Sequence, residues 1–145
     1  MQSIIFDFET TGINFQDKTI PQRAIQLAWI IIDQNTEIID QKNYYISGNT
    51  EINTDFHQHL SVDFLNKNGV DVKTVIDLFH KDVLNVINSG GFLIAHNIDF
   101  DYKVYRNELF VTNGIQININ PNQKLCTMKS TTDYCKLPSR YMPCL

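Results

Sequence analysis

The sequence predicts an α/β domain built on a mixed β-sheet, and two observations carry that prediction. Three β-patterned segments occupy the first 46 residues, the second and third of them joined by a short turn. After residue 70 the apolar residues change to a helical spacing, and helices then alternate with short strands, which is typical of α/β domains. The length of 145 residues suits one domain with a sizeable core, so we expect residues 1–145 to form a single domain.

The N-terminal third holds the strands. The apolar run at residues 4–6 is typical of a buried central strand, covered on both faces of the sheet. Residues 13–22 are polar and predict a loop. Residues 24–32, rich in Ile, Leu and Trp, predict a second buried strand. A turn signal at 33–36 and a β pattern over 37–46 then complete an antiparallel hairpin.

The rest of the chain predicts helices between strands. Apolar residues recur every three or four positions over 72–87, which indicates one face of a helix, and Asn88-Ser89-Gly90-Gly91 should end it. The later elements alternate in type: a strand at 92–95, a helix at 99–110 ended by Asn113-Gly114, a strand within 115–126 and a short helical piece at 128–134.

Composition argues against several classes of protein. The longest apolar run, residues 27–32, is far short of the roughly 20 residues that span a membrane, so we expect no membrane association. The N-terminus lacks a signal-peptide pattern, which favours a cytoplasmic location. Cys126, Cys135 and Cys144 form no C-x-x-C pair and are expected to be free thiols. A net charge of −4 does not favour binding nucleic acid through a general positive field, but it leaves room for a nuclease.

The first candidate site is Asp7-Phe8-Glu9-Thr10-Thr11-Gly12, which follows the first apolar run. Residues i and i+2 of a strand point to the same side and lie roughly 7 Å apart, so Asp7 and Glu9 would present two carboxylates together. Such a pair needs a positive partner, and Mg²⁺ or Mn²⁺ is the usual one for oxygen ligands. Gly12 permits a sharp exit from the strand with positive φ. The competing interpretation is a solvated strand edge.

The second candidate site is His96-Asn97-Ile98-Asp99-Phe100-Asp101, at the end of the strand over 92–95. Ligands of α/β sheets gather at the carboxyl ends of strands, and both candidate sites lie there. If the two strands are neighbours, Asp101 in the first helical turn would face Asp7 and Glu9. Asp99 is better explained as a helix N-terminal residue that is stabilised by the helix dipole.

These two motifs resemble those of the DnaQ-like 3′–5′ exonucleases, the superfamily named for four acidic residues. The first matches the D-x-E-T-T-G motif and the second the H-N-x-x-F-D motif; residues 24–28 also fit the family's second strand. The resemblance covers nearly the whole chain. It implies an RNase H-like fold, two bound Mg²⁺ or Mn²⁺ ions, and hydrolysis of nucleic acid from its 3′ end.

The resemblance assigns roles position by position. Asp7, Glu9 and Asp101 match the catalytic, metal-binding carboxylates. Thr10 and Thr11 match positions beside the terminal nucleotide and its 3′ hydroxyl. His96, Asn97 and Phe100 match positions that shape the substrate pocket, with a capping role for His96 and a core role for Phe100 as alternatives. The expected partner is a single-stranded or frayed 3′ end of DNA or RNA, with a polymerase or another replication or repair protein as a further partner.

The sequence departs from the family in its third motif, which supplies a fourth acidic residue and a general base as H-x-x-x-x-D or Y-x-x-x-D. No His follows His96, and the acidic residues beyond Asp101 are Glu108 and Asp133. We therefore expect a truncated or C-terminally divergent member, weakly active or inactive by itself. His57, His59 and His80 are expected to be ordinary surface or packing residues.

Two other functions stay open. One is a catalytically inactive RNase H-like module that binds nucleic-acid ends or a protein. The other is a different phosphoryl-transfer enzyme, such as an endonuclease. A P-loop or dinucleotide-binding protein is disfavoured because neither G-x-G-x-x-G nor G-K-[ST] occurs.

Overall fold

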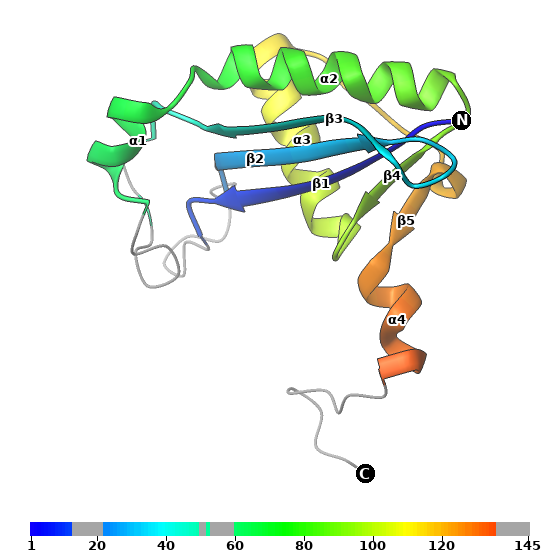
Figure 1. Cartoon of the computed structure of the whole chain (residues 1–145). Coiled ribbons are helices and arrows are strands. Elements are labelled where there is room, and N and C mark those ends of the chain that lie inside the picture. The colour runs from blue at the N-terminus through cyan, green and yellow to red at the C-terminus, as the bar shows by residue number, and fades with distance from the viewer. Residues whose placement is uncertain (13–21, 50–51, 53–59, 136–145) are drawn as a thin grey trace.

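The computed structural model describes residues 1–12, 22–49, 52 and 60–135, and in these ranges the chain forms a five-stranded mixed sheet with four α-helices (Figure 1). The strands are β1 (Ser3–Thr10), β2 (Ala24–Ile32), β3 (Ile38–Tyr45), β4 (Phe92–Ala95) and β5 (Lys124–Cys126). The helices are α1 (Val62–Asn68), α2 (Val72–Asn88), α3 (Ile98–Asn113) and α4 (Thr127–Cys135), and a 3₁₀ turn covers Pro121–Gln123.

The strand order β3-β2-β1-β4-β5 makes β1 the central strand, as predicted. β1 pairs antiparallel with β2, and β2 with β3, which confirms the hairpin. On its other side β1 pairs parallel with β4, and β4 with β5. Because β1 and β4 run in the same direction, their carboxyl ends lie at the same edge of the sheet, which is where both candidate motifs follow.

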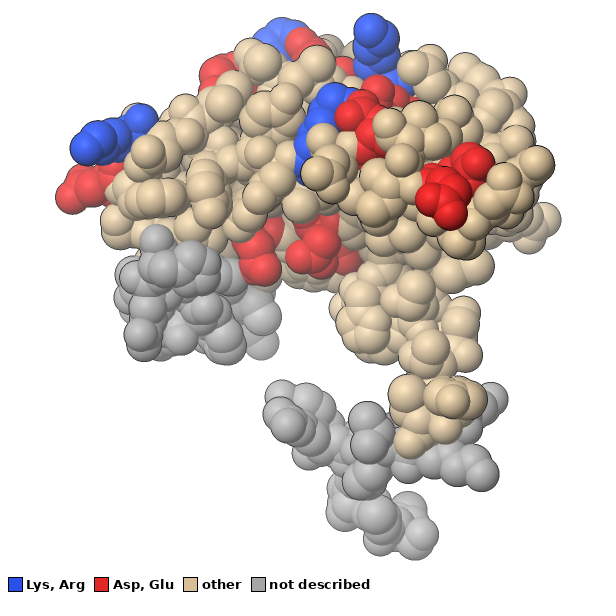
Figure 2. Space-filling view, viewed as in Figure 1, with Lys and Arg blue, Asp and Glu red and all other residues tan. Residues whose placement is uncertain are grey.

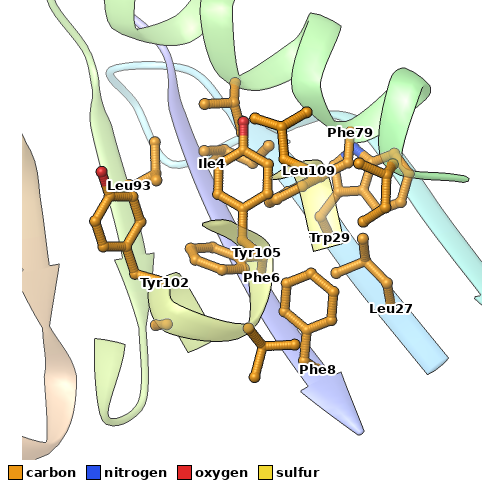
Figure 3. Close-up of a cluster of buried hydrophobic side chains, with 14 of the residues drawn as sticks. Ile4, Phe6, Phe8, Leu27, Trp29, Phe79, Leu93, Tyr102, Tyr105 and Leu109 are labelled. Carbon is orange, nitrogen blue, oxygen red and sulfur yellow. The ribbon is translucent and has the colours of Figure 1, made fainter. Parts of the chain in front are cut away.

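An aromatic core fills the space between the sheet and the helices α2 and α3 (Figure 3). Phe79 of α2 lies at its centre: its ring centroid is 5.2 Å from that of Phe6, 5.3 Å from that of Trp29 and 5.0 Å from that of Tyr105. Such ring pairs add to the stability that burial of their apolar surface already provides. The helix spacing predicted from the sequence therefore places its apolar face on the sheet.

The bounds of α2 follow from its caps. The Asp71 side chain accepts a hydrogen bond from the backbone N–H of Thr74 at 3.1 Å and so starts the helix. Gly90, with φ of 80°, takes the left-handed conformation that ends it. A Cβ atom on Gly91 would lie 1.8 Å from the backbone oxygen of Gln2, so only glycine allows α2 to turn this closely into β4.

The opposite face of the sheet differs from the prediction that the first strand is covered on both sides. Along β1, Ile4, Phe6 and Phe8 are buried, whereas Ile5 is only half-buried and Asp7 is exposed. The reason is that α2 and α3 pack on one face, the face that carries the core. Within the described residues the other face of β1 remains partly open to solvent.

The helix α1 was not predicted. It is seven residues long, and Ser61 caps it by accepting a hydrogen bond from the N–H of Phe64 at 3.1 Å. Its residue Leu65 packs with Ile25 and Leu60 in a small cluster separate from the main core. A helix with one fully buried residue has too little apolar periodicity to be recognised in the sequence.

Several smaller predictions have definite outcomes. Cys126 and Cys135 are free thiols, as predicted. His80 is half-buried and packs against α3, with its Nδ1 atom 2.6 Å from the hydroxyl of Tyr105. Cys144, His57, His59 and nearly all of the loop expected at 13–22 lie outside the described residues. No helix in the described ranges has the length and hydrophobicity to cross a membrane.

Candidate active site

The structure brings the two acidic motifs together through one hydrogen bond. Asp101, in the first turn of α3, is buried, and its Oδ1 atom accepts the backbone N–H of Phe8 at 3.0 Å. Phe8 lies between Asp7 and Glu9, whose side chains share the open face of β1. In Figure 2, acidic side chains stand on the lower side of the molecule, and no basic side chain is visible beside them.

Burial and mutual repulsion act on these carboxyl groups. The pKa of Asp101 is raised to about 6, first because burial penalises its charged form and further because Asp7 and Glu9 are near. The hydrogen bond from Phe8 opposes that rise. Burial also raises the pKa of Asp7, against the attraction of His96. Asp7 and Glu9 are therefore close enough to Asp101 to disfavour its charged form, and a bound cation would relieve that repulsion.

The donor chemistry of the site fits a divalent cation, although its geometry in this structure is not that of a closed metal centre. Asp7, Glu9 and Asp101 offer carboxylate oxygens, which are the ligands that Mg²⁺ and Mn²⁺ prefer. Within the described ranges, however, no three His, Cys, Asp or Glu side chains are arranged to hold a metal ion. Closing the site requires side-chain adjustment or a further donor.

The two threonines shape the exit from β1. Thr10 is buried, and its Oγ1 atom accepts the N–H of Gly12 at 3.4 Å. The Oγ1 atom of Thr11 accepts the N–H of Arg23 at 3.2 Å, and the N–H of Thr11 donates to the Arg23 backbone oxygen at 2.9 Å. Gly12 has φ of 86°, the conformation expected from the sequence. Each hydroxyl oxygen thus accepts a backbone N–H at the end of β1.

The second motif forms the tight connection from β4 into α3. Asn97 precedes the helix with φ of 70°, a left-handed conformation that Asn tolerates better than most residues. His96 is exposed, and its Nδ1 atom lies 3.1 Å from the hydroxyl of Thr127 at the start of α4. His96 also lies near enough to Asp7 to stabilise its charged form. These positions keep the predicted substrate-binding roles open.

The remaining residues of the second motif face different surroundings. Asp99 lies in the first turn of α3, as predicted, and is paired with Lys129 of α4 at 2.5 Å. Phe100 is half-buried and packs against the main core, which supports its core alternative. Asp99 therefore stands apart from the carboxylates that meet at β1.

A buried ion pair beside the site was not predicted from the sequence. Glu108 of α3 is fully buried and binds Arg23 through both oxygens, with Oε1 2.8 Å from Nε and Oε2 2.9 Å from Nη2. Oε1 also accepts the N–H of Ala24 at 2.8 Å. Because Arg23 in turn holds Thr11, Glu108 positions the end of β1. The one sequence signal is its spacing, seven residues or two helical turns after Asp101.

A cavity of about 610 Å³ opens beside the carboxylates on the uncovered face of the sheet. Asp7 and His96 line it together, and Thr127 extends the polar part of its wall. Ile5 and Ile30 contribute an apolar floor. The predicted metal ligand Asp7 and the predicted pocket residue His96 thus share one space large enough for a nucleotide.

A mixed sheet with helices packed on one face, and carboxylates at the end of its central strand and at the start of the helix after β4, defines an RNase H-like nuclease fold. The chain belongs to the exonuclease family of RNase T, whose family model matches residues 4–143, within the DnaQ-like 3′–5′ exonuclease superfamily. The search of curated sequences found no relative.

Solved structures share this fold. Exonuclease I of E. coli in complex with a dT13 oligonucleotide matches with 17% identity and a TM-score of 0.60, over 77% of this chain and 24% of that one. A 3′-exonuclease bound to a histone mRNA stem-loop matches with 16% identity and a TM-score of 0.63, over 94% of this chain and 50% of the other. The nuclease domain of 3′hExo bound to rAMP matches with 19% identity and a TM-score of 0.57, over 94% of this chain and 72% of that one. The chain thus spans about a quarter of the length of the exonuclease I structures.

Proposed function

We propose that this chain is the nuclease domain of a metal-dependent 3′–5′ exonuclease that acts on a single-stranded or frayed 3′ end of DNA or RNA. The observation that carries the proposal is the Phe8–Asp101 hydrogen bond, which draws the helical carboxylate to the acidic pair of β1. Membership of the exonuclease family supports it. So do neighbours of the same fold that were solved with a dT13 oligonucleotide and with a histone mRNA stem-loop.

In this proposal Asp7, Glu9 and Asp101 hold the cations, two of them in the complete site. Bound there, a divalent cation supplies Lewis-acid chemistry: it lowers the pKa of an attacking water and stabilises charge on the departing oxygen. The chain's own groups orient the substrate. The hydroxyls of Thr10 and Thr11 lie at the exit from β1, and His96 lines the cavity together with Asp7.

The proposal includes an incomplete catalytic set. Glu108 does not serve as a fourth ligand, because both of its oxygens are bound to Arg23 and Ala24. The general base and fourth carboxylate would come from outside the described residues or from a partner. General-base assistance contributes about 10² to 10⁴ in rate, so we expect weak activity from these 145 residues alone.

Partners and location belong to the same proposal. One neighbour of this fold is an ExoI/SSB-Ct complex, which shows that an exonuclease of this fold can be found bound to another protein. A polymerase or another replication or repair protein stays a prediction for this chain, as does a cytoplasmic location.

The proposal is tested by cation binding and by cleavage measured together. Mg²⁺ or Mn²⁺ at about 100 times its dissociation constant should stabilise the folded chain by about 2.7 kcal/mol, seen as a higher melting temperature. Asp7→Asn should remove that response, whereas the matched control Asp63→Asn, in the first turn of α1, should keep it. A 5′-labelled linear oligonucleotide with Mn²⁺ should show slow loss of nucleotides from its 3′ end, and a circular one should stay intact.

The outcomes separate the candidate functions. Cleavage of the circular oligonucleotide would show that the chain is an endonuclease and not an exonuclease. Absence of any cation response in the unaltered chain would favour the inactive RNase H-like module, a candidate supported by the lack of a closed three-ligand cluster in the described residues.

A further inference from the structure

A second cavity lies on the outer side of α3, away from the sheet core. It has a volume of about 350 Å³ and is lined by Gln116 and by residues that follow one stripe of the helix: Asp99, Tyr102, Lys103, Arg106, Asn107 and Phe110. We refer to it as the α3 pocket. Positions 99, 102/103, 106/107 and 110 recur at intervals of three or four, so these residues share one helix face. Asp101, on the other side of the helix, points to Phe8.

The α3 pocket carries uncompensated positive charge. Its one carboxylate among these residues, Asp99, is already paired with Lys129 at 2.5 Å. Lys103 and Arg106 have no carboxylate within ion-pair distance in the described part of the chain. Elsewhere, Arg23, Lys42 and Lys73 are each paired. In a protein of net charge −4, such a group of unpaired cations favours an anionic ligand.

The ring of Tyr102, which lines the α3 pocket, contacts two cations, one from the pocket lining and one from β5. The Arg106 Cζ atom lies 5.8 Å from the ring centre of Tyr102, and the Nζ atom of Lys124 of β5 lies 4.2 Å from it. The Tyr102 hydroxyl accepts the N–H of Ile119 at 2.8 Å, which fixes the ring. Figure 3 shows Tyr102 at the opposite end of the core from Trp29. Arg106 of α3 and Lys124 of β5 are therefore both held against one fixed ring.

Two further side chains suit a nucleic-acid strand. The amide nitrogen of Asn107 is buried and has no acceptor among the described residues, an unfavourable state that a phosphate oxygen in the pocket would relieve. Phe110 is 52% exposed at the other end of the stripe. Exposed aromatic rings beside cations are the elements that bind single strands, through base stacking and phosphate contacts.

We infer that the α3 pocket binds the phosphate backbone of the nucleic acid upstream of its 3′ end, an inference that rests on the proposed exonuclease function. The same helix carries Asp101 in its first turn and the pocket on its outer side. A strand whose end lies at the carboxylates has to pass around one helix diameter, about 10 Å, to reach Lys103 and Arg106. The aromatic residues favour nucleic acid over an acidic peptide, which needs charge alone.

The test measures binding of the full chain to a long single-stranded oligonucleotide by fluorescence anisotropy, in EDTA so that no cleavage occurs. The variant combines Arg106→Gln with Lys124→Gln. Each phosphate contact contributes about 0.7 to the slope of log K against log salt concentration for a single strand, so the slope should fall in magnitude by about 1.4. The control combines Lys67→Gln with Lys81→Gln, two exposed lysines of α1 and α2, and should keep the slope of the unaltered chain.

A dinucleotide extends the test to the site itself. A dinucleotide bound at the carboxylates is too short to reach the α3 pocket as well, so the Arg106 and Lys124 changes should leave its affinity unchanged. Equal slopes for all three proteins would overturn the inference while leaving the exonuclease proposal standing. So would tighter binding of a polyglutamate peptide than of the oligonucleotide at this pocket. No binding of either oligonucleotide by the unaltered chain, even with Ca²⁺ present, would overturn both. Circular dichroism of each variant confirms that it is folded.

Discussion

At Asp101 the stability of the fold and the proposed function conflict. The residue is 2% exposed, and its carboxyl group accepts a backbone hydrogen bond from Phe8 and stands near two other acidic groups. A carboxyl group whose pKa is raised on folding destabilises the folded state once the pH exceeds both its unfolded and its folded values. Without a cation, this side chain therefore weakens the fold at neutral pH.

Asp101→Asn should separate the two effects. The amide oxygen keeps the hydrogen bond from Phe8, but the buried charge is gone, so metal-free stability at pH 7 should rise by about 1 kcal/mol. In the unaltered chain the contribution of this group falls as pH rises from about 4 to about 6, the span between the ordinary pKa and the raised one. The Asn variant should lack that fall. Urea unfolding at several pH values in EDTA measures both effects.

The functional effect of Asp101→Asn is measured on the same protein, through its cleavage activity and its stabilisation by cations. Both should be lost, with activity down by more than about 100-fold, because even outer-shell partners of metals cost 10–100-fold. An Asn variant that is less stable than the unaltered chain at pH 7 would show that the carboxylate is not under strain. An Asn variant that still responds to Mg²⁺ would remove Asp101 from the ligand set.

At the scale of secondary-structure elements, the end of β1 is fixed by the start of β2 and by α3. Glu108 reaches from α3 to Arg23, and Arg23 holds Thr11 through two hydrogen bonds. Arg23 is partly exposed, whereas Glu108 is fully buried. Removing the arginine would therefore leave a carboxylate in the interior with only the Ala24 N–H as partner.

Arg23→Met should destabilise the chain by about 3 kcal/mol, because it leaves Glu108 charged, buried and unpaired. The double variant with Glu108→Leu should recover most of that loss, since paired buried charges are often replaceable by apolar residues of similar volume. Thermal or urea unfolding gives the comparison. Equal losses for the single and double variants would mean that the Arg23 side chain acts through packing and not by neutralising Glu108, since its hydrogen bonds to Thr11 use backbone atoms that the change keeps.

At the scale of the whole molecule, the sheet is one-sided in the described residues. The core face of β2 carries Trp29 and Ile31, and the other face carries Ile30, which lines the large cavity beside the carboxylates. Two neighbouring residues of β2 thus lie in different environments: Ile31 in the buried core and Ile30 in the wall of the cavity. The difference offers a direct test of which face holds the stabilising core.

Ile31→Ala should lower the free energy of unfolding by about 2–4 kcal/mol, as expected for a buried aliphatic side chain. Ile30→Ala, a chemically identical change one position away, should cost about 1 kcal/mol or less. The same urea titration measures both. A loss at Ile30 as large as that at Ile31 would show that the open face is covered in solution by a segment outside the described ranges.

The sequence was most informative where the signal is local. The helical spacing of Val75, Ile76 and Phe79 and the turn between β2 and β3 lie within a few residues, so α2 and the hairpin were predicted nearly to their ends. The acidic motifs predicted that Asp101 would lie near Asp7 and Glu9, and the structure places it there, because strand alternation and helix position decide which way these side chains point.

Contacts between residues far apart in the chain, and elements with a weak apolar pattern, could not be predicted from the sequence. Arg23 and Glu108 are 85 positions apart, and nothing near either residue marks the other as its partner. The short helix α1 has one fully buried residue, Leu65. A run such as Ile-Ile-Phe occurs in strands that are covered on one face and in strands that are covered on both. The prediction that both faces of β1 are covered was therefore wrong for the described residues.

The bond between Phe8 and Asp101 also sets an order of events when the protein is made. Its two ends are separated by 93 positions along the chain. A ribosome that adds roughly 5–20 residues per second needs about 5–19 s to deliver the second end after the first. During that interval the nascent polypeptide carries two of the three carboxylates that are proposed to bind a metal ion, and the third arrives only when α3 has emerged.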